Sequence, residues 1–316
     1  CFTVEAGNRA APPIHPHRHQ SDAIRAILQP PADNVIIATG TGSGKSFCFG
    51  IPIVSECLRM RDRGVRGIKA VIVYPMNALA NSQYDDFARR LDGSGLKLAL
   101  YTGDTFTNPE QALEAFREIT GREQPFDSEV ISREDIRDTK HDILMTNYVM
   151  LELLLTRFED RILFPPEHAG VLQFLVLDEV HTYTGQRGAD VACLIRRLKQ
   201  HTHTTGSLRC IATSATVQSG EGEDAETLIA DFAARLFGEP FDAGQVIGES
   251  YAPLPDDLPP LARSIAEALA AGPLSLRQLA QALDVTPDQI QEALCPSQSP
   301  ASQSPSLPAP KLHAFF

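Results

Sequence analysis

The sequence lacks the features of a membrane-spanning or secreted protein. It contains no run of about 20 apolar residues that could cross a bilayer, and its first residues contain no apolar signal-peptide core. None of its six cysteines forms a C-x-x-C pair. We therefore expect free thiols in a cytoplasmic protein, with no disulfide framework, zinc knuckle or membrane partner. The chain also lacks an initiator methionine, and we expect it to be a fragment of a longer polypeptide.

Positive charge is also scarce, because the formal net charge is −12. Residues 221–260 hold ten acids against one base, so the rest of the chain carries only −3. Residues 59–69 carry five bases against Asp62. Phosphate binding depends on the local field rather than on the total charge, so a nucleic-acid partner is not excluded. The basic stretch is equally consistent with a solvated helix end and loop.

Short apolar runs alternate with helical stretches through the first three quarters of the chain. The runs are nearly continuous in apolar residues, which is typical of strands buried on both faces. Strand and helix in alternation predict an α/β domain with a doubly wound, mostly parallel sheet, over residues 1–240. The predicted strands are 34–40, 69–75, 98–103, 141–147, 174–180 and 209–216.

The remaining residues predict a linker and a small helical appendage. Residues 241–260 are rich in proline and aspartate, and 261–295 contain three helical patterns that resemble a winged-helix core. The third pattern carries Asp288 and Glu292 but no base, so we expect it to contact a partner or support the fold rather than read DNA. Residues 296–310 are predicted to be a disordered Pro/Ser/Gln linker, and 311–316 the start of a following region.

A glycine-rich loop, ATGTGSGKS at 38–46, follows one predicted strand and precedes a helical pattern. Its glycines let several backbone N–H groups face one anion, and the following helix adds the positive end of its dipole. Lys45 would neutralise the β- and γ-phosphates, and Ser46 would bind Mg²⁺. The strict phosphate-loop pattern has glycine where this chain has Thr39. The residues predicted to bind ATP are Thr39, Gly40, Thr41, Gly42, Ser43, Gly44, Lys45 and Ser46.

Two adjacent carboxylates follow another apolar strand, in LVLDEVH at 175–181. Ligands of open α/β sheets bind at the carboxyl ends of the strands, where Asp178 would lie. Asp178 would bind Mg²⁺, and Glu179 would orient or deprotonate the attacking water. An acidic pair alone means little, but together with the phosphate loop it predicts an Mg–ATP site with Ser46 and Asp178 as metal ligands.

Taken together, GSGKS (42–46), DEVH (178–181) and SAT (214–216) resemble motifs I, II and III of the superfamily 2 DExH-box helicases. The resemblance covers about residues 10–240, and several longer strings are most similar to large bacterial proteins of phage defence and DNA repair. It implies a RecA-like fold, ATP hydrolysis and nucleic-acid binding, with DNA expected rather than RNA. It also implies partners in a defence or repair complex.

The same resemblance implies roles for residues outside the glycine-rich loop and the acidic pair. Gln20 matches the glutamine that reads adenine, and His181 would couple the nucleotide site to the strand-binding face through Ser214, Ala215 and Thr216. The segments PMNALA, YTGDT and MTNY match motifs that grip the strand. The implied nucleic-acid contacts are Pro75, Asn77, Ala78, Thr102, Gly103, Thr146 and Asn147.

Simpler interpretations stay open for several of these residues. Thr146 and Asn147 could form an ordinary strand-to-helix cap, and Ser214 and Thr216 could be turn residues. Asn77 replaces an arginine of the family, so its phosphate contact would be weaker. The spacing of His15, His17 and His19 could suggest a metal site, but no nearby cysteine or carboxylate supports one.

We expect an ATP-hydrolysing helicase or translocase. The family's second RecA-like domain, which carries the arginine fingers, has no counterpart after residue 240. The alternatives are a duplex translocase that does not unwind and an ATP-binding scaffold in a defence complex.

Overall fold

The computed structural model describes residues 16–30, 33–40, 42–138, 141–215, 225–248, 260–270, 276–287 and 289–290. The chain divides into two units, residues 1–250 and 251–316. Within the described residues, every helix is too short or too polar to cross a membrane.

The first unit is built on one eight-stranded sheet in which all paired strands are parallel, in the order β4-β3-β5-β2-β6-β7-β1-β8. The predicted doubly wound parallel sheet is confirmed, and each of the six predicted strands is present. The strands are β1 (Val35–Ala38), β2 (Ala70–Tyr74), β3 (Leu98–Tyr101), β4 (Glu129–Val130), β5 (Ile143–Asn147), β6 (Phe174–Leu177), β7 (Arg209–Ser214) and β8 (Val246–Gly248).

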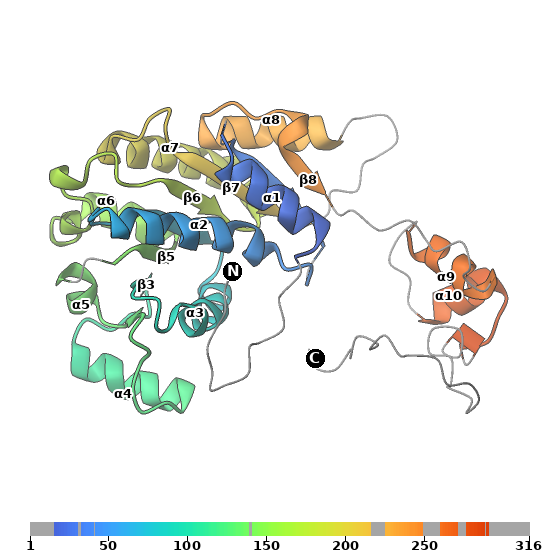
Figure 1. The fold of residues 1–316 in the computed structure, drawn as a ribbon, viewed down its shortest axis with the longest axis horizontal. Helices are drawn as coiled ribbons and strands as arrows, with labels where there is room; N and C mark the ends of the chain where they lie inside the picture. Colours follow the sequence, from blue (N-terminus) through green and yellow to red (C-terminus); the bar gives the residue numbers. More distant parts are fainter. Residues whose placement is uncertain are drawn as a thin grey trace. The chain divides into compact units, whose positions relative to one another are not determined.

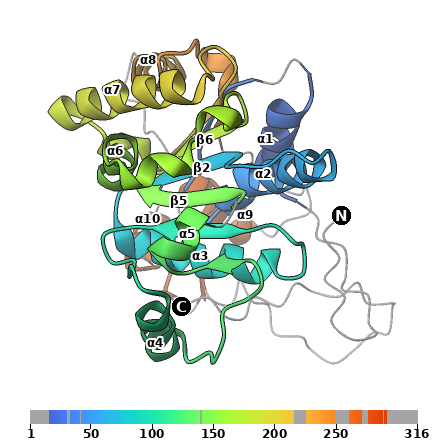
Figure 2. The same cartoon turned by 90° about the vertical axis from the view of Figure 1, so that its left-hand side faces the viewer.

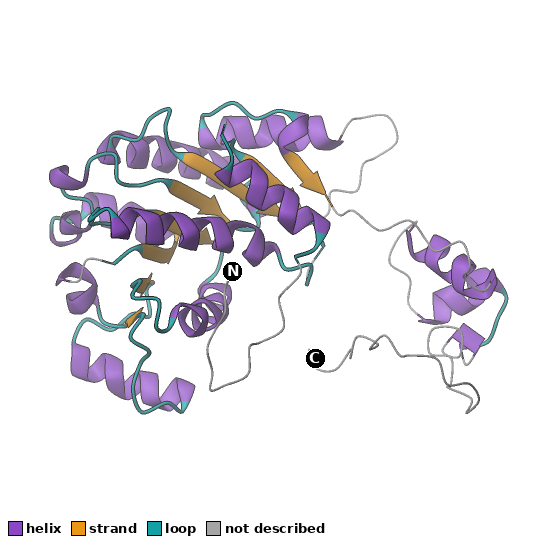
Figure 3. Ribbon diagram, in the orientation of Figure 1, coloured by secondary structure: helices purple, strands orange, loops and turns teal. Residues whose placement is uncertain are grey.

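Helices cover both faces of this sheet (Figures 1 and 3). Apolar residues of α1, α2 and α3 pack in one core cluster, and those of α6, α7 and α8 pack in the other. Figure 2 shows these two sets on opposite sides of the strands. The helices are α1 (Arg18–Leu28), α2 (Lys45–Asp62), α3 (Asn77–Leu91), α4 (Pro109–Thr120), α5 (Arg133–Asp138), α6 (Tyr148–Thr156), α7 (Gly185–Thr202) and α8 (Ala225–Phe237). Short 3₁₀ helices are η1 (Glu159–Leu163), η2 (Pro166–His168), η3 (Val180–Thr182) and η4 (Ala243–Gln245).

The continuous apolar runs are explained by burial on both sides. In β2, Val71 and Val73 face the α6–α8 side, whereas Ile72 and Tyr74 face the α1–α3 side. All five residues of β2 are buried. Burial of a side chain such as Ile72 stabilises the fold by roughly 1.5–3 kcal/mol, so the sheet needs apolar residues at successive positions.

The sheet extends beyond residue 240, at which we expected the domain to end. Strand β8 lies inside the expected linker 241–260 and pairs with β1, Ala38 aligning with Gly248. Strand β4 was also not predicted. Both strands lie at sheet edges, β8 with only three residues and β4 with only two, so neither produces an apolar run long enough to recognise.

In the second unit the structure describes α9 (Pro260–Ala270) and α10 (Leu276–Leu283). Ile265, Leu279 and Ile290 are buried together there. The Ile290 N–H donates to the Thr286 carbonyl at 3.2 Å, as in a first helical turn. The rest of the third predicted helix, like 249–259 and 296–316, lies outside the described residues, and the winged-helix arrangement stays a prediction.

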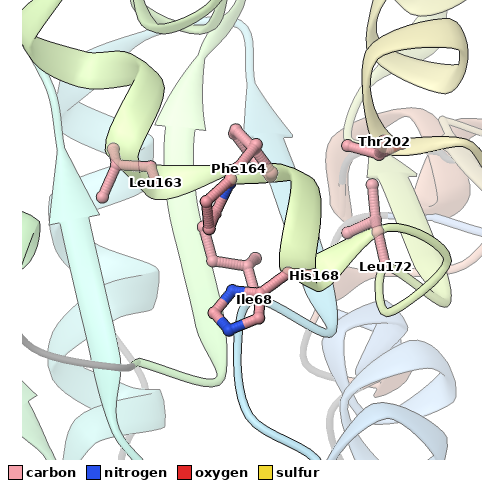
Figure 4. A pocket seen from close by; sticks show the side chains of 7 residues that line it. Ile68, Leu163, Phe164, His168, Leu172 and Thr202 are labelled. Carbon is pink, nitrogen blue, oxygen red and sulfur yellow. The ribbon is translucent and has the colours of Figure 1, made fainter.

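A small pocket lies beside the amino ends of β2 and β6 (Figure 4). Its volume is about 10 Å³, which corresponds to no more than one water molecule. This pocket is therefore too small for a nucleotide, and ligands of parallel sheets bind at the opposite edge. It is lined by Ile68, Leu163, Phe164, Pro165, His168, Leu172 and Thr202.

Candidate active site

The strand order brings three loops together at the carboxyl edge of the sheet. Strand β7 lies between β1 and β6 and is parallel to both. The glycine-rich loop follows β1, the acidic pair follows β6, and Ser214 ends β7. Segments that are distant in the sequence therefore meet around the end of β7.

The glycine-rich loop requires glycine at two positions. Gly42 and Gly44 have φ of 83° and 78°, in the left-handed region that other residues rarely adopt. A Cβ on Gly44 would also lie 2.4 Å from the Gln20 side-chain nitrogen. The Thr39 and Ser43 hydroxyls lie 2.7 Å apart across the loop, so the residue that departs from the strict pattern braces it. Thr41, which follows Gly40 in the loop, lies outside the described residues.

Helix α1 supports the loop from one side. The Gln20 amide donates to the Ser43 and Gly44 carbonyls at 3.3 Å each, and its oxygen accepts from the His17 N–H at 2.9 Å. The His19 ring nitrogen Nε2 lies 3.0 Å from the Ser43 carbonyl. The hydrogen bonds of Gln20 thus hold the glycine-rich loop, and adenine recognition by this residue stays a prediction. His17 and His19 stack with ring centroids 5.7 Å apart, and His15 lies outside the described residues.

The Lys45 ammonium joins all three loops. It donates to the Thr39 carbonyl at 3.1 Å, and to the Ser214 carbonyl and Glu179 Oε1 at 3.2 Å each. Only 11% of its side chain is exposed. An ammonium held this close to the loop can neutralise an incoming phosphate without moving far.

Asp178 is held by a residue that the sequence analysis missed. The fully buried Thr213 of β7 donates its hydroxyl hydrogen to Asp178 Oδ1 and accepts from the Glu179 N–H at 3.0 Å. Burial raises the pKa of Asp178, while the Thr213 hydrogen bond opposes that rise. The one available signal was a polar residue in the apolar run before Ser214.

Glu179 has an unusual backbone conformation. Its φ of 48° and ψ of 55° lie in the left-handed region, at a cost of roughly 1–2 kcal/mol for a residue with a Cβ. Such strained residues occur often at functional sites. Its buried Oε2 accepts no hydrogen bond from the residues that the structure describes, although the His181 Nδ1 lies 3.3 Å away.

His181 lies between the acidic pair and the end of β7. Its Nδ1 is 3.4 Å from the Ser214 hydroxyl, and half of its side chain is exposed. The arrangement places His181 next to Ser214, one of the residues through which it would act. Ala215 follows Ser214 and is partly buried, whereas Thr216 lies outside the described residues.

The oxygen donors at this edge suit Mg²⁺ bound together with phosphates. A serine hydroxyl and an aspartate carboxylate are hard ligands, and Mg²⁺ usually takes its other ligands from water and phosphate. Ser46 donates its hydroxyl hydrogen to Gln83 Oε1 at 2.6 Å, which leaves its lone pairs available. In the described part of the chain, no three or more His, Cys, Asp or Glu side chains form a metal-binding group. The oxygens of Ser46 and Asp178 are thus of the type that Mg²⁺ binds together with phosphates, and binding of the cation there stays a prediction.

A second group of side chains lies at the carboxyl ends of β2, β3 and β5. The Asn147 amide donates to Asn77 Oδ1 at 2.7 Å, and the Asn77 amide donates to Asp104 Oδ2 at 2.8 Å. Asn147 Oδ1 also accepts from the Met150 N–H, which caps α6. Asn147 is therefore a helix cap that is also bonded to another predicted strand contact.

The two predicted threonine contacts face the protein interior. The Thr146 hydroxyl donates to the Tyr101 carbonyl at 2.7 Å, and Thr102 is 1% exposed. Both residues are almost completely buried, backbone included, so contact with a nucleic acid at these two positions stays a prediction. Gly103 and Ala78 are exposed, and Pro75 is partly buried.

Comparisons with known proteins indicate the family of the chain. The chain is similar to "Druantia protein DruE" of Escherichia coli, with 30% identity over 68% of this chain and 16% of that protein. It is also similar to "Uncharacterized ATP-dependent helicase YprA" of Bacillus subtilis, with 27% identity over 64% of this chain and 23% of that protein. The chain thus spans less than a quarter of the length of either relative.

Solved structures show the same fold. The DUF1998 helicase MrfA bound to DNA aligns with a TM-score of 0.51 and 26% identity, over 73% of this chain and 25% of that one. The DEAD-box helicase Mss116 bound to single-stranded RNA aligns with a TM-score of 0.53 over 85% of this chain and 48% of that one. At 17% identity, the Mss116 likeness concerns the fold alone.

The DEAD/DEAH box helicase family model matches residues 17–224, which is about two thirds of the chain. This match spans the glycine-rich loop, the acidic pair and the end of β7. The chain belongs to the DEAD/DEAH box helicase family.

Proposed function

We propose that this chain is the ATP-binding motor domain of a nucleic-acid helicase or translocase. The observation that carries the proposal is the set of contacts made by Lys45, which joins the glycine-rich loop to Glu179 and to the end of β7. Family membership and the relatives named as ATP-dependent helicases support it.

In the proposed reaction, Lys45 exchanges its protein acceptors for phosphate oxygens when ATP binds. Ser46 and Asp178 hold Mg²⁺, which when bound neutralises charge on the phosphates. Glu179 orients the attacking water and takes its proton, and the Thr213 hydrogen bond fixes the backbone of Glu179 for this task. His181 and Ser214 couple the nucleotide site to the ends of β2, β3 and β5, where the nucleic acid would bind.

The missing charge stabilisation would come from an arginine finger on a second RecA-like domain. Such a finger contributes about 10³-fold or more in related nucleotide hydrolases. We therefore expect this chain alone to bind ATP weakly and to hydrolyse it slowly. In the proposed protein, the second domain also completes the grip on the nucleic acid.

The nucleic acid would lie along the ends of β2, β3 and β5. Contacts there would come from backbone groups and short side chains such as Asn77 and Gly103, which position a strand without reading its sequence. We propose DNA as the partner, since the MrfA relative was solved bound to DNA. The resemblance to defence and repair DExH proteins suggests partner proteins of such a complex.

Binding of a fluorescent ATP analogue with Mg²⁺ tests the nucleotide site in this chain. Lys45→Ala should weaken binding at least tenfold, whereas Lys97→Ala, which removes a lysine paired with Asp127, should not. Equal binding by the two variants would refute the proposal.

The reaction itself is tested in a protein that joins this chain to a second motor domain. Glu179→Gln should trap bound ATP there, and unchanged turnover would refute the catalytic role of Glu179. Strand displacement by the same protein would distinguish a helicase from a translocase that does not unwind, because both need the same nucleotide site.

A further inference from the structure

The Ser46 hydroxyl has a partner on a different helix, Gln83 of α3, 37 residues later in the chain. We propose that Gln83 is a positioning residue, which orients the Ser46 hydroxyl for Mg²⁺. It also links that hydroxyl to helix α3, which begins at the edge of the sheet where the nucleic acid would bind. This inference rests on the proposed function, since it assigns a support to the metal ligand of that site.

The direction of the hydrogen bond is what makes Gln83 useful. Ser46 donates its hydrogen to Gln83 Oε1 at 2.6 Å, so the lone pairs of its oxygen point away from that hydrogen and stay free for a cation. A serine hydroxyl without a fixed acceptor would rotate among its staggered positions. Groups that orient a metal ligand typically alter metal affinity by about 10–100-fold when they are removed.

Helix α3 is packed against the start of α2, so Gln83 is not loosely placed. Phe87 lies against Gly50, where an added Cβ would come within 2.9 Å of the Phe87 ring. The guanidinium of Arg90 lies 4.7 Å from the centroid of the Phe47 ring. Positions 83, 87 and 90 share one face of a helix, so that face of α3 holds the first turns of α2.

The first residue of helix α3 lies at the edge of the sheet where the nucleic acid would bind. Helix α3 begins at Asn77, whose side chain bonds to Asn147 and Asp104. Asn77 precedes Gln83 by six residues, which is about 9 Å along a helix. A displacement of Asn77 along the helix axis would therefore shift the acceptor of the Ser46 hydroxyl.

The test measures how much Mg²⁺ is needed for binding of a fluorescent, non-hydrolysable ATP analogue. Gln83→Leu removes the acceptor at similar volume, and should raise the half-saturating Mg²⁺ concentration about 10–100-fold. Gln83→Glu keeps an acceptor oxygen and should need no more Mg²⁺ than the unaltered chain. Gln111→Leu, on the exposed face of α4, is the matched control and should change nothing.

A double-mutant cycle ties the effect to Ser46. In a Ser46→Ala background, Gln83→Leu should have no further effect, because the hydroxyl that it orients is gone. An unchanged Mg²⁺ requirement in Gln83→Leu, or additive effects of the two substitutions, would overturn the inference. If Lys45→Ala also failed to weaken analogue binding, the proposed function itself would fail. Binding that needs Lys45 but ignores Gln83 would refute only the role of Gln83.

Discussion

Replacement of Thr213 by valine should weaken the fold and the nucleotide site together. The substitution keeps the shape of the side chain but removes the hydroxyl that bonds to Asp178 and to the Glu179 N–H. Both partners would be left without that hydrogen bond in the interior. Each such group costs about 1–3 kcal/mol, so Thr213→Val should lower the free energy of unfolding by roughly 2–6 kcal/mol.

The loss should also act on the acidic pair. The Thr213 hydrogen bond opposes the rise in pKa that burial imposes on Asp178, so its removal should raise that pKa further. Without the bond to its N–H, Glu179 would lose one restraint on its left-handed backbone. We therefore expect weaker Mg²⁺-dependent ATP binding as well as lower stability.

Urea unfolding of the chain measures the stability, and Thr213→Ser is the control because it keeps the hydroxyl and loses one methyl group. The serine variant should lose only about 1 kcal/mol. The reasoning is refuted if the valine and serine variants unfold at the same urea concentration and bind the ATP analogue equally well.

Other features of the described residues lead to further predictions. Asp104→Asn removes a negative charge near the proposed nucleic-acid contacts and should strengthen single-stranded DNA binding about two- to fivefold, because exposed charge interactions contribute roughly 0.2–1 kcal/mol. The gain should shrink at higher salt, which binding titrations at two salt concentrations would show. Lys69→Met breaks a buried ion pair with Asp142 of 2.7 Å and should lower the free energy of unfolding by about 3–5 kcal/mol in urea, whereas adding Asp142→Asn should restore part of it. Iodoacetamide at pH 8, followed by peptide mapping, should label the exposed Cys193 and spare the buried thiols. Burial raises the pKa of those thiols, to about 12 for Cys48 and Cys210. Labelling of the buried thiols as fast as Cys193 would contradict their burial. The protected thiols are Cys48, Cys57 and Cys210.

The parts of the fold that were predictable are those with a local signal. Central parallel strands are apolar at every position because both faces are covered, so β2 and β6 stand out in the sequence. The edge strands β4 and β8 are too short to produce that signal. The expected domain boundary therefore fell before β8, although β8 belongs to the sheet.

The site shows the same division. The glycine-rich loop and the acidic pair are each contiguous, so their residues could be identified from local pattern. Thr213 and Gln83 act on residues 35 and 37 positions away, and only the strand order and the packing of α3 on α2 bring them into place. Asn147 was left open between a cap and a strand contact, and the structure shows the cap together with a bond to Asn77.

The position of β8 has a consequence for protein engineering. Because β8 runs parallel to β1 with Gly248 beside Ala38, the sheet returns the chain to the edge where the glycine-rich loop begins. Neighbouring strands are about 4.8 Å apart, so a module fused after residue 248 would be tethered close to the start of the glycine-rich loop. A short tether at that point would give the module a high effective concentration at the loop, whereas attachment near Asn34, at the other end of β1, would require a tether long enough to pass along the sheet.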